Sequence, residues 1–290
     1  MNSDNEIEEA LKYFRGKTIV VKYGGAAMQA SGLKRCVVKD IVYIQSMGAS
    51  VVLVHGGGPE ISALQERLGL ERRFVQGLRF TDEGTMDAVV MALCGKVNKE
   101  LVRLIGNEGG RAVGLCGIDG GIIKCRKQEE PDLGYVGEIV KIKKELLLNL
   151  IMGDIIPVIS SVGLGEDGLA YNINADTAAG RVAAALSADC FITLSDVPGV
   201  LHDMSDPTSL IVEMEVGEAK GLIESGVVSG GMIPKVRGQI DAISRGARTA
   251  SIIDGRVPHA LVFALVTRAA VEQGEIQRLK QGFVGTTIVA

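Results

Sequence analysis

The chain has 290 residues, of which 47% are hydrophobic and 23% charged, a balance typical of a globular protein. Its formal net charge of −4 and its lack of Trp argue against a nucleic-acid-binding surface, which usually needs a basic stripe or aromatic stacking platforms. No apolar run reaches the roughly 18 residues of a membrane span, and the acidic N-terminus does not resemble a signal peptide, so we expect a cytoplasmic protein.

In the first half of the chain, apolar runs rich in β-branched residues alternate with segments of helical periodicity. The runs that predict buried strands are 18–23, 50–55, 111–117 and 154–163. The segments that predict helices are 5–14, 33–48, 56–69 and 80–110. For the last helix we expect Thr81 or Asp82 as the N-cap and, at Gly95, a kink or close packing.

The remaining chain begins with a different pattern. Short β-like runs with turn signals over 120–142 predict a hairpin or a meander. Helices are then predicted at 176–188 and 231–247, and strands at 190–200, 249–255 and 285–290. Pro234 falls in the first turn of its helix, where proline is allowed.

Apolar strands that alternate with helices predict an α/β fold, with a mainly parallel sheet and helices on both faces. We place a soft boundary near residues 185–190. It divides the chain into an N-terminal lobe, 1–187, and a C-terminal lobe, 188–290, which share one continuous sheet. In an open parallel sheet, ligands bind at the carboxyl ends of the strands.

Two glycine turns follow predicted strands. In VKYGG, Lys22 ends a strand and precedes Gly24 and Gly25, whereas a P-loop lysine follows its glycines. In VHGGGPE, Gly57 and Gly58 open a helix, where free backbone N–H groups and the helix dipole favour an anion. The alternatives are a solvated lysine at a strand end and an ordinary tight turn.

Two later segments place polar side chains beside predicted helices. In AYNINADTAAG, Asn172, Asn174 and Asp176 alternate, so an extended segment would present them on one face to a polar ligand. The alternative is an Asx-rich loop in which Asp176 caps the next helix. In SGGMIPKV, Lys235 near a helix N-terminus opposes the dipole, which is unfavourable unless an anion lies there.

His55 and the cysteines are interpreted as structural residues. Because His55 precedes its glycine turn, we expect a hydrogen-bonded packing residue rather than a base. The five cysteines form no CxxC pair and the chain has three histidines, so no zinc site is predicted. We expect reduced, mostly buried side chains at Cys36, Cys94, Cys116, Cys125 and Cys190.

Together, two lysines, two glycine turns and a carboxylate fit phosphoryl transfer. That reaction needs positioning and neutralisation of charge more than it needs a protein nucleophile. Mg²⁺ would be held mainly by the phosphates of the nucleotide, as this ion commonly is.

The chain resembles the amino acid kinase family, and within it the kinases of N-acetyl-L-glutamate, over residues 10–260. The segments that carry the resemblance are VKYGGAAM, VHGGGPEI, GLRFTDEGTM, GKVNKELV, YNINADTAAG, SGGMIPKV and TASIIDGR. The resemblance implies a three-layer αβα sandwich on a mainly parallel open sheet. It also implies that ATP phosphorylates the γ-carboxylate of N-acetyl-L-glutamate, the second step of arginine biosynthesis, with the amino acid in the N-lobe and ATP in the C-lobe.

The resemblance also assigns roles to single residues. Lys22 and Lys235 match the two lysines that stabilise the transferring phosphoryl group, and Asp176 matches the aspartate that orients both. Arg79 matches the arginine that clamps the α-carboxylate of the substrate, a geometry that suits a guanidinium. Asn172 matches a substrate-binding asparagine.

Glycines complete the site that the resemblance implies. Gly57 and Gly58 match backbone donors to the acetylated substrate, and Gly24 and Gly25 match the loop near the phosphates. The residues that fall where the family binds the nucleotide are Ser195, Asp196, Gly230 and Gly231.

The two ends of the chain depart from arginine-inhibited relatives. There, an N-terminal helix joins dimers into a hexameric ring, and here NEIEEALKYFRGK starts late in that helix. The segment 262–284 is longer and more diverged than the usual link to the last strand. We therefore predict a homodimer, with a hexamer and arginine control as the alternative. GIDGG, residues 117–121, also differs from the commoner lysine-bearing version.

Two other functions remain open from the sequence. One is a kinase for an acyl-aminoadipate in lysine biosynthesis, which Arg79 and Asn172 do not discriminate because both substrates carry an α-carboxylate. The other is a non-catalytic arginine-sensing paralogue or a binding partner of a PII-type nitrogen-signalling protein. The complete set of chemical residues weighs against the second.

Overall fold

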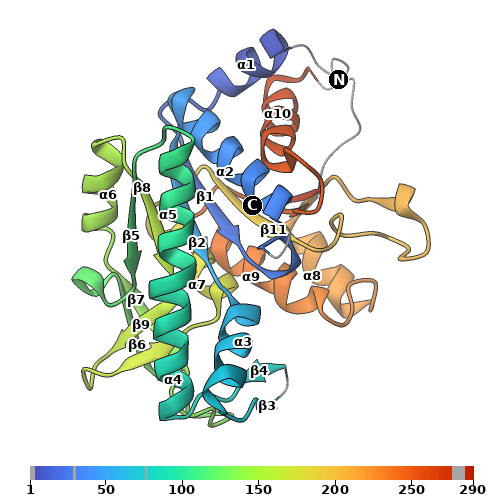
Figure 1. Cartoon of the computed structure of the whole chain (residues 1–290). Helices are drawn as coiled ribbons and strands as arrows, with labels where there is room; N and C mark the ends of the chain where they lie inside the picture. Colours follow the sequence, from blue (N-terminus) through green and yellow to red (C-terminus); the bar gives the residue numbers. More distant parts are fainter. Residues whose placement is uncertain (1–3, 29–30, 76, 276–284) are drawn as a thin grey trace.

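One eight-stranded sheet runs through the protein, whose computed structural model describes residues 4–28, 31–75, 77–275 and 285–290 (Figure 1). Its strands are β1 (Thr18–Tyr23), β2 (Ser50–His55), β5 (Ala112–Cys116), β8 (Ile156–Ser160), β11 (Cys190–Ser195), β12 (Glu213–Glu215), β13 (Thr249–Asp254) and β14 (Thr286–Val289). Their order across the sheet is β12-β14-β13-β11-β1-β2-β8-β5.

The six strands from β13 to β5 are parallel, as each neighbouring pair in that part of the sheet shows. β14 runs antiparallel to β13, and β12 is parallel to β14, so the two strands at this edge are reversed. The predicted mainly parallel sheet is confirmed. It takes strands from both sides of residue 187.

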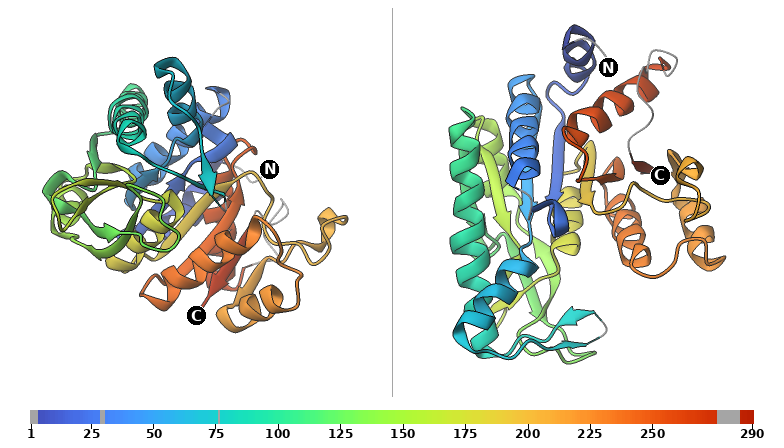
Figure 2. Two further views of the ribbon diagram at one scale, coloured as in Figure 1. Left: turned by 90° about the horizontal axis from the view of Figure 1, so that it is seen from below. Right: turned by 45° about the vertical axis from the view of Figure 1, so that its right-hand side comes forward.

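Helices cover both faces of the sheet, which makes the predicted three-layer sandwich (Figure 2). Side chains along β1 alternate between two apolar clusters, with Ile19 and Val21 in one and Val20 in the other. The first face carries α2 (Ser31–Ser46), α5 (Asn98–Asn107) and α10 (Ala260–Gln273), with α1 (Asp4–Lys12) packed on α10. The second face carries α6 (Glu145–Met152), α7 (Ala175–Ala185), α8 (Val216–Glu224) and α9 (Met232–Ser244).

A smaller, four-stranded sheet lies beyond the carboxyl ends of the large one (Figure 1). Its order is β10 (Ala170–Asn172), β9 (Val162–Gly165), β6 (Ile123–Lys127) and β7 (Gly137–Ile142). The hairpin predicted over 120–142 is confirmed as β6 and β7. The single strand predicted at 154–163 is wrong, because β8 ends at Ser160 and the chain passes into the smaller sheet at Val162.

Several short elements surround these layers. They are α3 (Gly58–Leu68), the hairpin of β3 (Phe74–Val75) and β4 (Leu78–Arg79), and the 3₁₀ turns η1 (Gly25–Met28), η3 (Asp119–Gly121) and η4 (Pro207–Ser209). The diverged segment is helical in α10, whereas residues 276–284 lie outside the described part of the chain. None of the described helices is both long and apolar enough to cross a membrane.

The long helix predicted over 80–110 is interrupted. α4 (Glu83–Val90) is followed by a π-helical segment, η2 (Met91–Val97), which leads directly into α5. Asp82 is the N-cap of α4, since its carboxylate accepts a hydrogen bond from Thr85 N at 2.8 Å. Close packing does not explain Gly95, because a Cβ there would meet no atom within 4 Å. The irregularity expected at Gly95 is the π-helical segment in which this residue lies.

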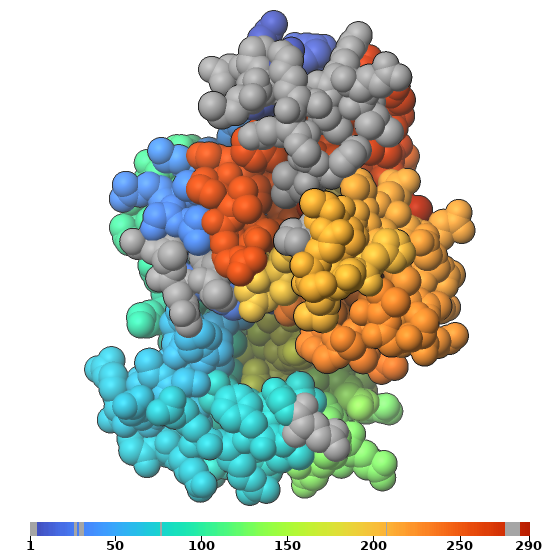
Figure 3. Space-filling model, turned by 90° about the vertical axis from the view of Figure 1, so that its right-hand side faces the viewer, coloured from blue at the N-terminus to red at the C-terminus, as the bar shows by residue number. Residues whose placement is uncertain are grey.

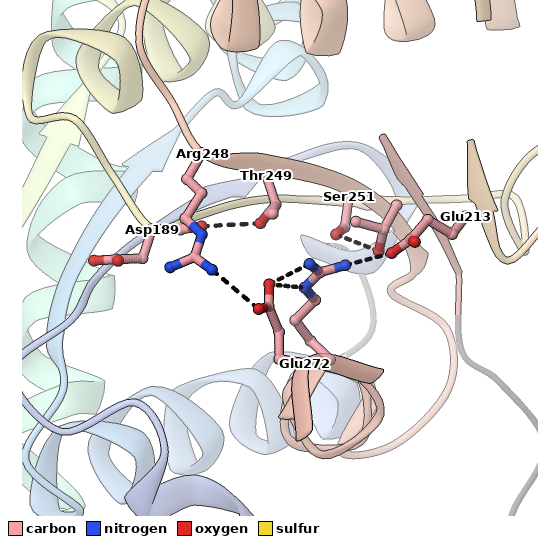
Figure 4. Close-up of polar contacts among 8 residues, drawn as sticks. Asp189, Glu213, Arg248, Thr249, Ser251 and Glu272 are labelled. Atoms are coloured by element: carbon pink, nitrogen blue, oxygen red, sulfur yellow. Dashed lines mark hydrogen bonds and ion pairs between the residues drawn. The ribbon is translucent and has the colours of Figure 1, made fainter. Parts of the chain in front are cut away.

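A network of charged side chains fixes α10 to the reversed edge of the sheet (Figure 4). Arg268 of α10 contacts Glu213 of β12 and Glu272 of its own helix. Glu272 also pairs with Arg248, just before β13, at 3.0 Å. The Arg268 side chain is only 13% exposed, so solvent screens these contacts less than it screens ordinary surface pairs.

Arg268→Met keeps an unbranched apolar chain and removes the guanidinium, which leaves Glu213 without this cation and Glu272 with Arg248 as its ion-pair partner. We expect the free energy of unfolding to fall by about 2 kcal/mol, between the ~0–1 kcal/mol of exposed pairs and the ~3–5 kcal/mol of buried ones. Urea denaturation measures the change.

The matched control is Arg245→Met at the C-cap of α9, because Arg245 forms an exposed pair with Asp241 one turn away, at 2.6 Å. Its loss should cost less than about 0.5 kcal/mol. Equal losses in both variants would show that the network does not fix α10.

Candidate active site

Lys22 is a buried cation at the carboxyl end of β1 and is paired with a carboxylate. Its Nζ lies 3.0 Å from Asp176 Oδ1, and Asp176 belongs to the first turn of α7. A charge in an otherwise apolar, buried strand needs such a partner. A Cβ at Gly24 would lie 3.0 Å from Lys22 Nζ, so glycine leaves room for the ammonium group.

Lys235 lies in the first turn of α9, and its ion-pair partner is Asp196, with Nζ and Oδ1 4.0 Å apart. Asp196 directly follows β11 and accepts a hydrogen bond from Ser195 Oγ at 3.2 Å. Within the described residues, no ion pair joins Lys235 to Asp176. The expectation that Asp176 orients both lysines therefore has contact evidence for Lys22 and stays a prediction for Lys235.

A buried amide ties α9, which carries Lys235, to the strand next to β1. Gln239 follows Lys235 by one helical turn and donates from Nε2 to Thr193 Oγ1 at 2.8 Å. Thr193 of β11 is the register partner of Lys22 in β1. Gln239 is 2% exposed and its Oε1 has no hydrogen-bond partner among the described residues. The sequence reasoning missed this residue.

The glycine turn after β2 brings three elements close together. A Cβ at Gly56 would lie 3.1 Å from Ala175 Cβ of α7, and one at Gly57 would lie 2.7 Å from Leu93 Cδ2 of η2. Gly57 is the N-cap of α3 and makes no side-chain cap hydrogen bond. Gly58, the first residue of α3, therefore presents a backbone N–H that no side chain of the cap satisfies.

The N-terminus of α9 resembles that of α3 in one respect. Gly231 is its N-cap, again without a side-chain cap, and Gly230 before it has φ +53°. By contrast, α4 and α7 both have side-chain caps. Only α3 keeps such an N–H open, as anion-binding helices do, because Met232 N and Ile233 N at the start of α9 donate to Ser229 O and Gly230 O.

Arg79, at the end of β4, is held against α3. Its Nη2 donates to Gly58 O at 3.1 Å and to Ser62 Oγ at 2.8 Å, and its Nη1 donates to Gln65 Oε1. The guanidinium carbon also lies 4.9 Å from the centroid of the Phe74 ring. Burial is the main cause that lowers the pKa of Arg79. A bound anion would offset this cost of desolvation.

Gln65 is a second residue that the sequence reasoning missed. It is fully buried in α3, and its Nε2 donates to Thr85 Oγ1 at 3.0 Å and to Glu71 O at 3.2 Å. These two bonds direct its oxygen toward Arg79. Gln65 therefore orients the guanidinium of Arg79 and links α3 to the start of α4.

The polar segment before α7 differs from its prediction. Asn174, not Asp176, caps α7, since Asn174 Oδ1 accepts from Thr177 N at 3.0 Å. Asn172 ends β10 and donates to Thr81 Oγ1 at 3.2 Å. Because the helix begins at Ala175, the three polar residues do not share one strand face. The helical turn is what directs Asp176 toward Lys22.

His55 is a packing residue, as predicted. It is fully buried, and burial lowers its pKa to about 4, so the imidazole is neutral. Nδ1 donates to Gly56 O at 2.9 Å, and Nε2 accepts from Asn98 Nδ2 at 3.1 Å. With both ring nitrogens engaged, His55 supports the glycine turn rather than acting as a base.

Figure 3 shows this side of the molecule hollowed between the α3–β4 region, in cyan, and the α8–α9 region, in orange. Lys22 and Ser195 end neighbouring parallel strands at this edge of the sheet. Such an arrangement of two cations and glycine turns suits the transfer of a phosphoryl group. Among the described residues, no group of three or more His, Cys, Asp or Glu is placed to hold a metal ion.

Comparison with known sequences covers almost the whole chain. The sequence profile of the amino acid kinase family matches residues 17–254. The acetylglutamate kinase of Acaryochloris marina is 51% identical over 268 residues, which are 91% of this chain and 94% of that protein. The acetylglutamate kinase of a Nostoc species is 52% identical over 264 residues, 90% and 89% of the two chains.

Solved structures share the fold. The crystal structure of smu.665 from Streptococcus mutans has a TM-score of 0.70 at 30% identity, over 81% of this chain and 94% of that one. N-acetylglutamate synthase from Neisseria gonorrhoeae, complexed with coenzyme A and N-acetyl-glutamate, has a TM-score of 0.81 at 21% identity, over 100% of this chain and 64% of that one. Giardia carbamate kinase has a TM-score of 0.66 at 18% identity, over 94% and 98%.

Gly57→Ala should destabilise the protein, because the new methyl group would lie 2.7 Å from Leu93 Cδ2 in a packed cluster. We expect a loss of about 1–3 kcal/mol in the free energy of unfolding, measured by urea denaturation. Gly58→Ala is the control, since a Cβ there meets no atom within 4 Å. If the two variants lost equal stability, the packing argument for Gly57 would be wrong.

Proposed function

The chain belongs to the amino acid kinase family, and from this premise we propose that it transfers the γ-phosphoryl group of ATP to the γ-carboxylate of N-acetyl-L-glutamate. This reaction is the second step of arginine biosynthesis. Relatives about half identical to the chain over nine-tenths of its length are named acetylglutamate kinase, which supports the proposal. The observation that carries it is the pair of buried Lys22 with half-buried Asp176, 3.0 Å apart, at the carboxyl end of β1.

The catalytic roles fall to two lysines and one aspartate. Lys22 reaches the transferring phosphoryl group from the sheet and Lys235 reaches it from α9, so that both neutralise charge in the transition state. Asp176 orients Lys22 through the ion pair and Lys235 when both lysines contact the phosphate. The acceptor carboxylate is already ionised near neutral pH, so no side chain has to take its proton.

The amino acid lies between α3 and β10. Arg79 uses three of its five N–H donors on described residues of α3, which leaves two for the α-carboxylate of the substrate. The backbone N–H groups of Gly57 and Gly58 donate to the acetylated end, and Asn172 adds a side-chain amide. Asn174, whose oxygen caps α7, acts on the site by fixing that helix rather than by touching the substrate.

The nucleotide occupies the C-terminal side of the site. The glycine turn before α9 and the end of β11 supply its contacts, and the turn after β1 lets the phosphates approach the backbone. The residues in these places are Gly24, Gly25, Ser195, Asp196, Gly230 and Gly231. Mg²⁺ enters with ATP, is held mainly by its phosphates, and neutralises part of their charge.

For the larger organisation we propose two lobes. Residues 1–187 would form the amino-acid lobe, which also dimerises, and residues 188–290 the ATP lobe. We propose a cytoplasmic homodimer. The alternatives are a hexamer and a complex with a PII-type nitrogen-signalling protein. Analytical ultracentrifugation of the purified chain, alone and with that protein, distinguishes them.

An ATP-coupled assay across several acceptors tests the function. We expect turnover with N-acetyl-L-glutamate at least ~100-fold above turnover with glutamate or aspartate, because a site that hydrogen-bonds a substrate group rejects analogues without it. Over N-acetyl-aminoadipate, which only adds a methylene group, we expect a preference of about tenfold or more. The assay is run with and without arginine. Preference for the aminoadipate derivative, or no phosphorylation of any acceptor, would contradict the proposal.

Lys235→Ala should lower kcat by about 10²–10³-fold, the effect of losing one preorganised contact to developing charge, with little change in the KM for N-acetyl-L-glutamate. Lys220→Ala, an exposed lysine on the neighbouring helix α8, is the control and should keep full turnover. A loss smaller than tenfold in Lys235→Ala would remove Lys235 from the catalytic group.

A further inference from the structure

Four side chains form a row across the sheet on the face that α5 covers. Tyr23, His55, Ser160 and Cys116 are successive register partners on β1, β2, β8 and β5. Register partners on neighbouring parallel strands point to the same face, so Ser160 and Cys116 lie side by side. The row is at the carboxyl ends of the strands, the edge that also carries the candidate active site.

The π-helical segment η2 brings a second cysteine onto this row. Cys94 Sγ lies 3.2 Å from Ser160 Oγ. Cys94 is partly exposed, whereas Cys116 is buried, and both pack in the apolar cluster between α3, α4 and η2. The expectation of reduced, mostly buried cysteines is confirmed for the chain as a whole, but Cys94 combines solvent access with two polar neighbours.

The two thiols perturb each other in opposite directions. Interaction with Cys116, and to a smaller extent the hydrogen bond with Ser160, lowers the pKa of Cys94 to about 7 against the effect of burial. The pKa of Cys116 is raised, first by the same interaction and then by burial. A large fraction of Cys94 is therefore thiolate near neutral pH, while Cys116 keeps its proton.

We propose that Cys94 and Cys116 form a modification site for low-molecular-weight disulfides such as oxidised glutathione, with Cys94 as the attacking thiol and Cys116 as the resolving thiol. The Cys94 thiolate attacks one sulfur of glutathione disulfide, which forms a mixed disulfide and releases one glutathione thiolate. That thiolate takes the proton of Cys116. The new Cys116 thiolate attacks the Cys94 sulfur, closes the protein disulfide and releases the second glutathione.

The placement of the pair connects it to the glycine turn. Closing a bond of about 2.05 Å between the sulfurs draws η2 toward β5. Leu93 is next to Cys94 and packs closely against Gly57, since a Cβ at Gly57 would lie only 2.7 Å from Leu93 Cδ2. The glycine turn therefore has little room to absorb a shift of η2. We expect oxidation to displace the backbone donors of Gly57 and Gly58, a consequence that rests on the proposed function.

The test is oxidation of the full chain with glutathione disulfide, alkylation of the remaining thiols and peptide mass spectrometry. We expect a Cys94–Cys116 cross-link that dithiothreitol reverses. In parallel, the KM for N-acetyl-L-glutamate should rise about tenfold, equivalent to one contact of ~1.4 kcal/mol, while the KM for ATP stays unchanged. The cross-link is read without any assay of activity, so its outcome is separate from the outcome of the proposed function.

Two variants separate the roles of the thiols. Cys94→Ser should form neither the cross-link nor a mixed disulfide at Cys116, and its KM should not respond to oxidant. Cys116→Ser should trap glutathione on Cys94. Cys36→Ser, which removes another partly exposed cysteine on α2, is the control and should behave as the parent chain.

Three results would overturn the proposal. Glutathione attached to Cys36 while Cys94 stays free would show that exposure alone decides reactivity. A stable mixed disulfide on Cys94 in the parent chain would remove Cys116 as the resolving thiol. A complete cross-link with an unchanged KM for N-acetyl-L-glutamate would disconnect the site from the glycine turn.

Discussion

The ion pair between Lys22 and Asp176 sets the arrangement of the site. Lys22 is the one charged residue in the strand β1, whose other side chains from Ile19 to Tyr23 are buried and apolar in character, so its ammonium group requires a partner inside the protein. Asp176 supplies it only because α7 starts beside the end of β1. The pair therefore fixes the start of α7 against the sheet, and the carboxylate keeps the ammonium at the strand end, where a phosphate can compete for it.

At this edge of the sheet, the two faces carry different kinds of polar side chain. On the face of α7 and α9, Lys22 and Thr193 meet Asp176 and Gln239, and charge is available for a ligand. On the face of α5, the row is neutral, and His55 is held uncharged by burial. The row supports the turns that carry the backbone donors.

The sequence predicted the central elements well and the fine positions of the site less well. The strands at 18–23 and 50–55 match to the residue, because fully buried strands read as unbroken β-branched runs. The predicted shared face of Asn172, Asn174 and Asp176 is wrong, and so is the alternative of Asp176 as the cap, since local spacing cannot tell which Asx side chain meets the first free N–H. Gln65 and Gln239 gave no signal, because their partners Thr85 and Thr193 lie 20 and 46 residues away in the chain.

The π-helical segment η2 has a consequence for how the length of this region can vary. α4 and α5 are joined by η2 without a loop, but each helix has a fixed contact of its own. α4 starts beside the hydrogen bonds that hold Arg79, and Asn98 of α5 donates a hydrogen bond to His55. The i→i+5 bonds of a π-helical turn enclose one residue more than the bonds of an α-helical turn, so Met91–Val97 absorbs an extra residue locally. A further insertion has no such place and would rotate α4 relative to α5 by about 100°. We expect natural variation to substitute residues in this segment freely at exposed positions such as Met91, while insertions are excluded from it.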